Sequence, residues 1–218
     1  MSIARTGTFG AYYGNTYDTS NALTTSEMQV NATYIYAYLT NKGWSINSIA
    51  AILGNMQAES SINPGRWQSD RVGGESSGHG YGLCQWTPYT KYTEWVSGDP
   101  STMDNNLSRI IYEVENSLQW YGTGNYAGMS FSDFSKSTES VSFLAIGFLL
   151  CYERPADQSS SVQEYRASLA NAWYEYLTGV TPPPGPGPGP GPTPSGNKKR
   201  KKYNFILFDK KKRMLRNG

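Results

Sequence analysis

Glu59 is the side chain whose setting in this sequence most favours catalysis. It ends an apolar stretch with helical spacing, and a glycine-rich segment, Gly78 to Gln85, follows it closely. A carboxyl group at a helix C-terminus faces the negative end of the helix dipole, and an apolar wall also disfavours its charged form. Both effects favour the protonated acid, which can donate its proton to a glycosidic oxygen. The alternative is a solvated glutamate that supports the turn at Asn63 or pairs with Arg66.

The helix that carries Glu59 is predicted from its capping and its apolar spacing. Ser45 can cap its start, and Asn63-Pro64-Gly65 prevents its continuation. The core face repeats at i, i+3, i+4 and i+7, and its residues are Ile46, Ile49, Ala50 and Leu53. Glu59 is therefore expected in or just after the last turn of a buried helix.

The rest of the body is predicted to be mainly α with a small β hairpin. Thr24 and Glu27 form a capping-box pattern at the start of a helix that ends at Gly43. Residues 107–114, 143–150 and 165–176 also show helical patterns, whereas 69–82 indicates a loop or hairpin and Tyr81 to Trp86 a short strand. The first and last helical patterns rest on Val30, Tyr34, Ile35, Tyr38 and Leu39, and on Tyr165, Leu169, Ala172 and Tyr176.

Composition divides the 218 residues into four segments. Residues 1–22 are predicted to be an irregular arm, 23–178 one catalytic-size domain, 179–197 a linker rich in proline and glycine, and 198–218 a basic tail. Ten of the 19 basic residues but one of the 17 acidic residues lie in the tail. The segment before it therefore has nine basic and sixteen acidic residues, a net charge of −7. An acidic body that carries a basic tail favours docking of residues 198–218 onto a partner, with a solvated tail as the alternative.

The cysteines, the single histidine and the length of the apolar runs argue against a disulfide-rich scaffold, a metal site and a membrane-spanning segment. Cys84 and Cys151 allow one optional disulfide and show no metal-ligand spacing, and His79 is the only histidine. We therefore expect neither a metal nor another cofactor, and we interpret His79 as a loop residue that touches substrate and Cys84 as a buried small residue rather than a nucleophile. The start of the sequence lacks the apolar core of a secretion leader, and no run of apolar residues is long enough to cross a bilayer.

Motifs spread over Leu23 to Leu177 resemble a known family. They are Asn31-Ala32, Tyr34-Ile35, Tyr38-Leu39, Gly43-Trp44, Ile52 to Ser60, Ile62 to Gly65, Trp67-Gln68, Tyr81 to Leu83, Gln85 to Pro88 and Tyr152 to Pro155. Together they resemble the tail-associated lysozyme domain of bacteriophages, especially the tail-tip proteins of short-tailed phages of Gram-positive hosts. The resemblance implies a lysozyme-like α+β fold, peptidoglycan glycan strands as substrate, and Glu59 as the catalytic acid.

A more distant comparison concerns the second catalytic group. Chicken-type lysozymes have an aspartate where this sequence has Gly80, so a nucleophile at that position is missing, and Gly80 to Gln85 instead resembles goose-type lysozymes and lytic transglycosylases. Three alternatives stay open. Glu75, or less favourably Asp70, activates a water molecule across the sugar in an inverting hydrolase. Otherwise Glu59 acts alone, first as acid and then as base, while the 6-hydroxyl of the sugar forms an anhydro product. In the third alternative the second carboxylate lies elsewhere, for example at Glu153, which can instead simply pair with Arg154 or another basic group.

Sugar polymers are bound by amide hydrogen bonds and flat aromatic faces. The residues expected to contact substrate are Gln85, Trp86, Tyr81, Trp67 and Tyr89, with Tyr92 as a further aromatic, although any single ring can instead belong to the core. The leading hypothesis is a muramidase carried at the tail tip of a phage particle, which cleaves the β-1,4 bond between N-acetylmuramic acid and N-acetylglucosamine during entry. The alternatives are an endolysin that acts at lysis and a non-catalytic tail protein that binds the wall. Its partners would be peptidoglycan and other tail proteins, and nucleic acid is not expected.

Overall fold

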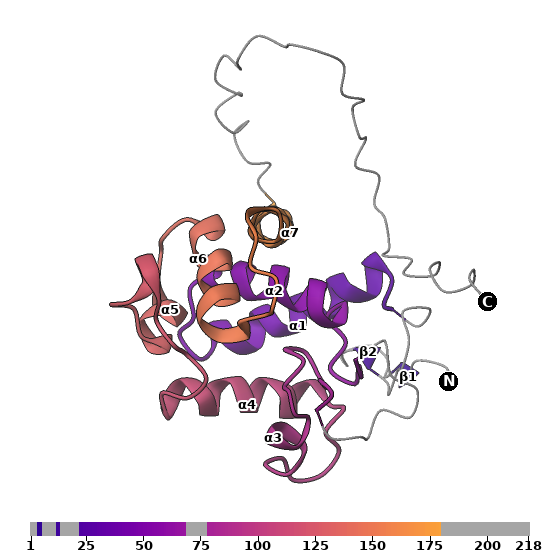
Figure 1. The fold of residues 1–218 in the computed structure, drawn as a ribbon. Coiled ribbons are helices and arrows are strands. Elements are labelled where there is room, and N and C mark those ends of the chain that lie inside the picture. The colour runs from indigo at the N-terminus through magenta and orange to yellow at the C-terminus, as the bar shows by residue number, and fades with distance from the viewer. Residues whose placement is uncertain (1–3, 6–11, 14–21, 69–77, 180–218) are drawn as a thin grey trace, which may run out of the picture. The chain divides into compact units, whose positions relative to one another are not determined.

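The computed structural model describes residues 4–5, 12–13, 22–68 and 78–179 (Figure 1). The chain divides between Thr181 and Pro182 into two units, and only the first contains described residues. The predicted linker and basic tail therefore lie outside the described residues, apart from Gly179.

The described body is mainly helical. Its helices are α1 (Thr25–Thr40), α2 (Ile46–Ser60), α3 (Thr90–Thr93), α4 (Met103–Glu115), α5 (Phe131–Lys136), α6 (Val141–Phe148) and α7 (Ser160–Thr178). Two shorter segments are the 3-10 helix η2 (Gly124–Tyr126) and the π-helix η3 (Leu149–Glu153). None of the helices in the described ranges is both long and apolar enough to cross a membrane.

The starts of the first two long helices follow from local hydrogen bonds. The Thr24 hydroxyl accepts from the Glu27 N–H, and the Glu27 carboxylate accepts from the Thr24 N–H at 2.8 Å, which confirms the predicted capping box. Ser45 caps α2 by accepting from the Ser48 N–H. The chain leaves α2 through a left-handed residue, Ser61, immediately before the predicted stop.

Helix α2 forms the centre of the core. Every residue from Ser48 to Met56 is buried, and α1, α5, α6 and α7 pack around it. In Figure 1, α2 lies in the middle of the body, α7 is seen along its axis above it, and α4 runs below. Gly54 allows α7 to approach closely, because an added Cβ would lie 2.5 Å from the Ala170 backbone nitrogen. This close contact packs the middle of α2 against α7, and Glu59 lies further along the same helix.

The buried faces of α1 and α7 differ from those predicted. Ile35 and Leu39 are buried as the spacing suggests, but Val30 is 44% exposed, and Tyr165 and Tyr176 lie on the surface of α7. The buried residues of α7 are Arg166, Ala167, Ala170 and Trp173. The prediction chose the wrong face of α7: Tyr165, Ala172 and Tyr176 are exposed, whereas Ala170 lies on the buried face, where its small side chain allows the close approach to Gly54 of α2.

The predicted strand from Tyr81 to Trp86 is not formed, so this stretch does not build the expected hairpin. Tyr81 makes single bridges to Trp67 and to Trp86, with Trp86 N–H donating to the Tyr81 carbonyl at 3.0 Å. Between them the chain turns at Gly82 (φ 82°) and Gln85 (φ 49°). Left-handed residues reverse the chain within a few residues, so a turn replaces the strand.

The segment predicted to be an irregular N-terminal arm contains a short paired element. Strands β1 (Ala4–Arg5) and β2 (Tyr12–Tyr13) are antiparallel, with Ala4 opposite Tyr13 and Arg5 opposite Tyr12. These are the strands of the described structure, and they lie far in sequence from the expected hairpin.

Candidate active site

Glu59 is the second-to-last residue of α2, as predicted, and its side chain is partly exposed. The exposed fraction of the side chain is 23%, although the helix before it is buried. The next residue, Ser60, stabilises the end of α2 because its hydroxyl donates to the carbonyl groups of Met56 and Leu83, each at 3.0 Å. The local structure therefore presents one carboxyl group from the end of a fixed, buried helix.

Arg166 on α7 is the charged partner of Glu59. Its Nη2 atom donates to Glu59 Oε1, and its Nη1 atom donates to the Asn55 carbonyl at 2.8 Å. The Arg66 pairing considered from sequence is not the one observed, since Arg66 Nη1 donates to the Ser61 hydroxyl at 3.0 Å. Arg166 thus links the last turns of α2 to α7 and holds the Glu59 carboxylate in one orientation.

A second carboxyl group, Glu153, lies on the other side of Arg166. Its Oε2 atom is 3.4 Å from Arg166 Nη1, and its side chain is only 4% exposed. Among the described residues, neither of its oxygens makes a hydrogen bond of good geometry. Burial, followed by repulsion from Glu59, raises the pKa of Glu153 well above its ordinary value. The pairing with Arg154 considered from sequence is replaced by this contact with Arg166.

Glu153 is placed by an unusual stretch of backbone. It ends the π-helix η3, which follows α6 directly, and the next residue, Arg154, is left-handed with φ 51°. π-Helical turns are rare and occur frequently at functional sites. Here the turn directs the chain out of α6 and leaves the Arg154 guanidinium over the ring of Tyr121, 4.1 Å from its centroid.

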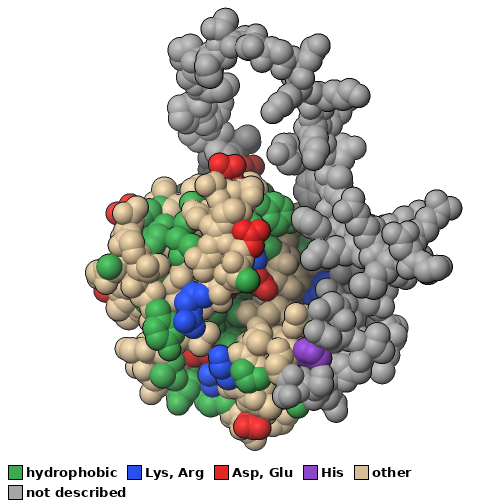
Figure 2. Space-filling model, in the orientation of Figure 1, with side chains coloured by type: hydrophobic (Ala, Val, Ile, Leu, Met, Phe, Trp, Pro, Cys, Tyr) green, Lys and Arg blue, Asp and Glu red, His purple; other side chains and the backbone are tan. Residues whose placement is uncertain are grey.

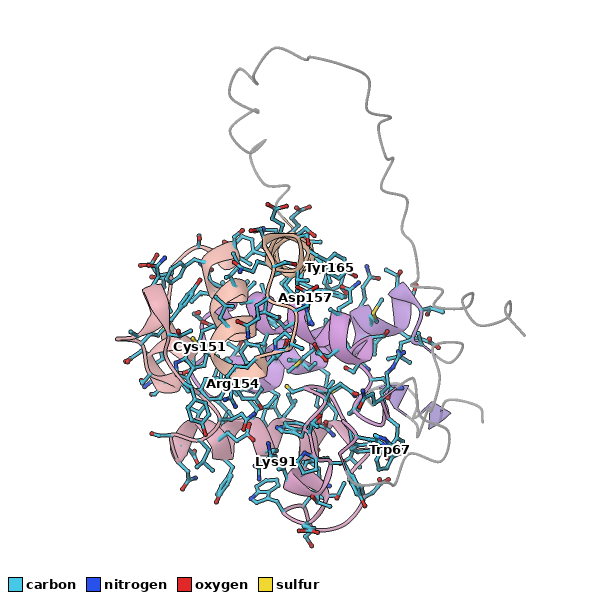
Figure 3. The ribbon with its side chains drawn as sticks, in the orientation of Figure 1. Trp67, Lys91, Cys151, Arg154, Asp157 and Tyr165 are labelled. Atoms are coloured by element: carbon cyan, nitrogen blue, oxygen red, sulfur yellow. The ribbon has the colours of Figure 1, made fainter. Side chains whose placement is uncertain are left out.

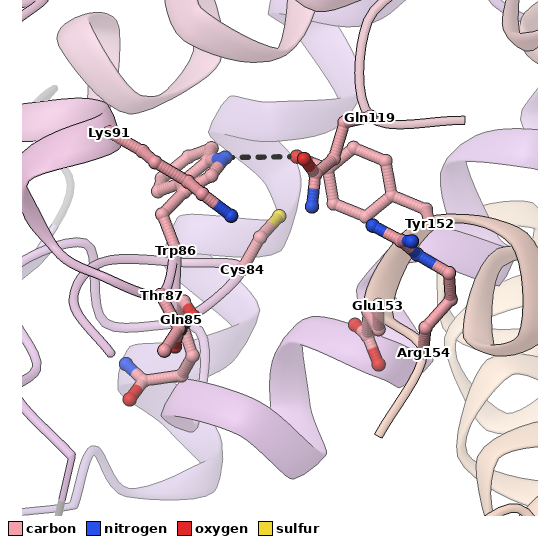
Figure 4. A pocket seen from close by; sticks show the side chains of 9 residues that line it. All are labelled: Cys84, Gln85, Trp86, Thr87, Lys91, Gln119, Tyr152, Glu153 and Arg154. Atoms are coloured by element: carbon pink, nitrogen blue, oxygen red, sulfur yellow. Dashed lines mark hydrogen bonds between the residues drawn. The ribbon is translucent and has the colours of Figure 1, made fainter. Parts of the chain in front are cut away.

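A cleft of about 320 Å³ lies beside this cluster. Figure 4 shows Gln85 and Thr87 on one side and Tyr152, Glu153 and Arg154 on the other. The complete lining is Cys84, Gln85, Trp86, Thr87, Lys91, Gln119, Tyr152, Glu153 and Arg154. Lys91 and Arg154 lie on the same face of the body in Figure 3. Glu153 thus lines the cleft directly, whereas Glu59 is not one of the lining residues and is linked to Glu153 through Arg166.

The wall of the cleft is held by a buried polar network. Trp86 Nε1 donates to both Glu113 Oε1 and the Tyr152 hydroxyl, at 3.1 and 3.0 Å, and the Tyr152 hydroxyl donates to Glu113 Oε2. Arg109 Nε completes the network with a 2.8 Å contact to Glu113. Burial raises the pKa of Glu113 despite these bonds. The network joins α4, the turn at Trp86 and η3, so it fixes the residue that precedes Glu153.

Comparison with known proteins decides the family. The family model described as "Phage tail lysozyme" matches residues 30–177. This chain belongs to the phage tail lysozyme family. It is 45% identical over 166 residues to "Morphogenesis protein 1" of Bacillus phage B103, an alignment that covers 75% of this chain and 43% of the relative. The chain therefore corresponds to less than half of that relative's length.

The region matched by the phage tail lysozyme model contains the whole charged cluster, namely Glu59, Glu153 and Arg166. The two other acids considered from sequence, Glu75 and Asp70, lie outside the described residues. Gly80 is closely packed, because an added Cβ would be 3.0 Å from Gln85 O, Gln85 Oε1 and Thr87 Oγ1. A carboxylate at position 80 would need its neighbours to move.

The aromatic residues proposed to bind sugar lie mostly in the core of this phage tail lysozyme domain. Trp67 and Tyr81 are 6% and 1% exposed, with ring centroids 4.5 Å apart. Trp86 is also buried, stacking on Tyr92, but it lines the cleft, whereas Tyr89 is half-buried against Trp67. This burial favours a structural role for Trp67 and Tyr81, and substrate contact stays a prediction.

Gln85 also reaches the cleft, but its amide has internal partners. Its Nε2 atom donates to the carbonyl groups of Arg66 and Gly82, both at 2.9 Å. Its bonds stabilise the turn that replaces the predicted strand, and a sugar contact by its remaining polar atom stays a prediction. Cys84 and Cys151 are both free and buried, so the optional disulfide is not formed. His79 is half-buried and precedes the packed Gly80.

Sequence reasoning missed Arg166. It is separated from Glu59 by 107 positions, and the predicted face of α7, formed by Tyr165, Leu169, Ala172 and Tyr176, did not include it. The available signal was an arginine next to the small residues Ala167 and Ala170, which mark the side of α7 that packs closely on α2.

Figure 2 shows that acidic and basic side chains are interspersed among neutral ones on the visible face of the body. The charge cluster described above is therefore a local arrangement rather than part of a surface dominated by one sign of charge on that face.

Proposed function

We propose that this protein is a virion-associated lysozyme that cleaves the β-1,4 bond between N-acetylmuramic acid and N-acetylglucosamine in peptidoglycan during phage entry. The single observation that carries the proposal is Glu59: a partly exposed carboxyl group at the end of a buried helix, oriented by Arg166. Membership in the phage tail lysozyme family and the likeness to a Bacillus phage morphogenesis protein support the glycan substrate and the virion setting.

In this mechanism Glu59 is the general acid. Its carboxyl group donates a proton to the glycosidic oxygen as the bond to the anomeric carbon breaks, which produces the leaving hydroxyl and positive charge on the sugar ring. The Glu59 carboxylate that results, together with Glu153, places negative charge beside the ring. Stabilisation of charge that develops in the transition state is a large contribution to enzymatic rate acceleration.

The second half of the reaction has two candidate routes. In the hydrolytic route a water molecule, activated by Glu75 or by Glu59 itself, attacks the anomeric carbon and leaves a reducing muramic acid. In the transglycosylase route the 6-hydroxyl of the same sugar attacks and returns a proton to Glu59, giving an anhydro end. Neither route uses a protein nucleophile at position 80, where Gly80 is closely packed.

A glutamate-to-glutamine exchange tests the general acid. Loss of a positioned general acid lowers turnover by about 10²–10⁴-fold, and we expect Glu59→Gln to show a loss in that range on purified Bacillus peptidoglycan. Glu115→Gln is the matched control, because Glu115 is the exposed last residue of another helix, α4. Mass spectrometry of the products shows which bond is cut and whether the new end is reducing or anhydro.

Equal clearing by wild type and Glu59→Gln would remove Glu59 from the mechanism, and absence of clearing by wild type would favour a non-catalytic wall-binding tail protein. Detection of the protein in purified particles separates the virion role from that of an endolysin released at lysis. Docking of residues 198–218 onto another tail protein stays a prediction of the sequence.

A further inference from the structure

The cluster at the cleft contains two carboxyl groups and one guanidinium group. Arg166 contacts Glu59 through Nη2 and approaches Glu153 through Nη1 at 3.4 Å. The Arg166 and Glu153 side chains are 9% and 4% exposed, so water screens this part of the cluster poorly. The three groups come from α2, η3 and α7: α2 and α7 pack on each other, and η3 packs on α6, which contacts both of these helices.

The charges of the cluster do not balance when both carboxyl groups are ionised. One guanidinium neutralises one carboxylate, and the remaining negative charge would lie in a buried setting that disfavours it. Glu153 is the group with least compensation, since neither of its oxygens makes a well-formed hydrogen bond within the described ranges. A single retained proton removes the excess charge. Two coupled carboxyl groups then titrate as a pair rather than as separate residues.

We infer that Glu153 and Arg166 are positioning residues for Glu59: the cluster retains one proton between the two carboxyl groups, and Arg166 pairs with the one that is ionised. The inference rests on the proposed function, in which Glu59 is the general acid. It explains how Glu59 can carry a proton although it contacts an arginine. When the proton is on Glu59, Arg166 neutralises Glu153 instead.

The proton balance follows through one turnover. Glu59 donates the retained proton to the leaving glycosidic oxygen, which leaves both carboxyl groups ionised and the cluster with a charge of −1 beside the positive sugar ring. The attacking oxygen, from water or from the 6-hydroxyl, then gives a proton back to Glu59. The cluster returns to neutrality, so the charge imbalance exists only while the ring is positively charged.

Other titratable groups around the cluster do not replace this pair. Cys84 interacts electrostatically with Glu153, Glu59 and Glu113 of α4, and Tyr165 interacts with its neighbour Arg166 on α7. Burial raises the pKa of the Cys84 thiol well above its ordinary value, so it stays protonated. Glu113 is bonded to Arg109, Trp86 and Tyr152, whereas Glu153 has only the contact with Arg166 and the facing carboxyl of Glu59.

The test is the pH dependence of peptidoglycan cleavage by the full chain with Glu153→Gln. Removing this carboxylate leaves Arg166 to pair with Glu59 alone, which favours ionised Glu59. The alkaline limb of the activity profile should therefore move to lower pH by about 1–3 units, the usual effect of one neighbouring charge. Activity at acid pH should persist. Glu153→Asp keeps the charge and should return the alkaline limb at least partly to its wild-type pH. Glu115→Gln should leave the pH of this limb unchanged.

A role of Glu153 in packing alone would lower activity by a similar factor at every pH. That result, an unchanged profile, or loss of activity at every pH in both Glu153→Gln and Glu153→Asp overturns the inference, provided Glu59→Gln is inactive. If Glu59→Gln keeps wild-type activity, the proposed function fails instead. Thermal unfolding of each variant shows that the compared proteins are folded.

Discussion

The contact between α2 and α7 supports a quantitative prediction for Gly54→Ala. An ideal Cβ at Gly54 would lie 2.5 Å from Ala170 N, 2.7 Å from Ala170 Cα and 2.8 Å from Ala170 Cβ. These are mostly backbone atoms, so a side-chain rotation cannot relieve the overlap and α7 must move. The substitution therefore tests whether close helix packing holds the site together.

The magnitude follows from two opposing effects. Overpacking of a core costs about 1–3 kcal/mol and occasionally more, whereas alanine favours a helix interior over glycine by about 1 kcal/mol. Because the overlap is with a helix backbone, the packing cost belongs at the upper end, and we expect a net loss of about 2 kcal/mol. For a domain of this size that loss corresponds to a fall in Tm of about 4–8 °C.

Thermal or urea unfolding followed by circular dichroism measures this loss. Gly128→Ala is the matched control, since its added Cβ would meet nothing within 4 Å and its backbone is not left-handed. It should leave stability unchanged or raise it by about 0.4–1 kcal/mol. Gly54→Ala should also lower cleavage well below its unfolding temperature, because Ala170 lies one helical turn from Arg166, whose guanidinium holds Glu59. A Gly54→Ala protein as stable and as active as wild type would refute the reasoning.

Two further variants test other parts of the structure. Thr24→Ala removes the capping box of α1 and should lower the free energy of unfolding by about 1 kcal/mol in chemical denaturation, with activity per folded molecule unchanged; no loss of stability would contradict the cap. Burial raises the folded-state pKa of Glu113 above its ordinary value of 4.5. The folded state therefore binds more protons than the unfolded state at pH values between these two pKa values, and wild-type stability falls as pH rises through that interval. Glu113→Gln lacks this ionisation and should gain stability relative to wild type as pH rises. A stability difference that does not change with pH would contradict the raised pKa of Glu113.

Much of the helical part of the fold was predictable because its signals are local. Thr24 with Glu27, and Ser45, satisfy backbone groups within one turn of the helix they start. Glu59 was likewise predictable from its place at the end of an apolar helix and from the motif around it. The strand expected at Tyr81 to Trp86 failed because left-handed Gly82 and Gln85 turn the chain between two single bridges.

By itself, the sequence determined the family, the helix that carries Glu59 and that residue as the candidate acid, because capping, apolar spacing and motif identity act over neighbouring residues. Only the tertiary structure decided what surrounds this acid. Arg166 reaches it from α7, and Glu153 reaches Arg166 from the π-helix after α6. Which charges share a buried site depends on which helices pack closely. Here that depends on Gly54 meeting Ala170, a contact between residues too distant in the chain for local patterns to reveal.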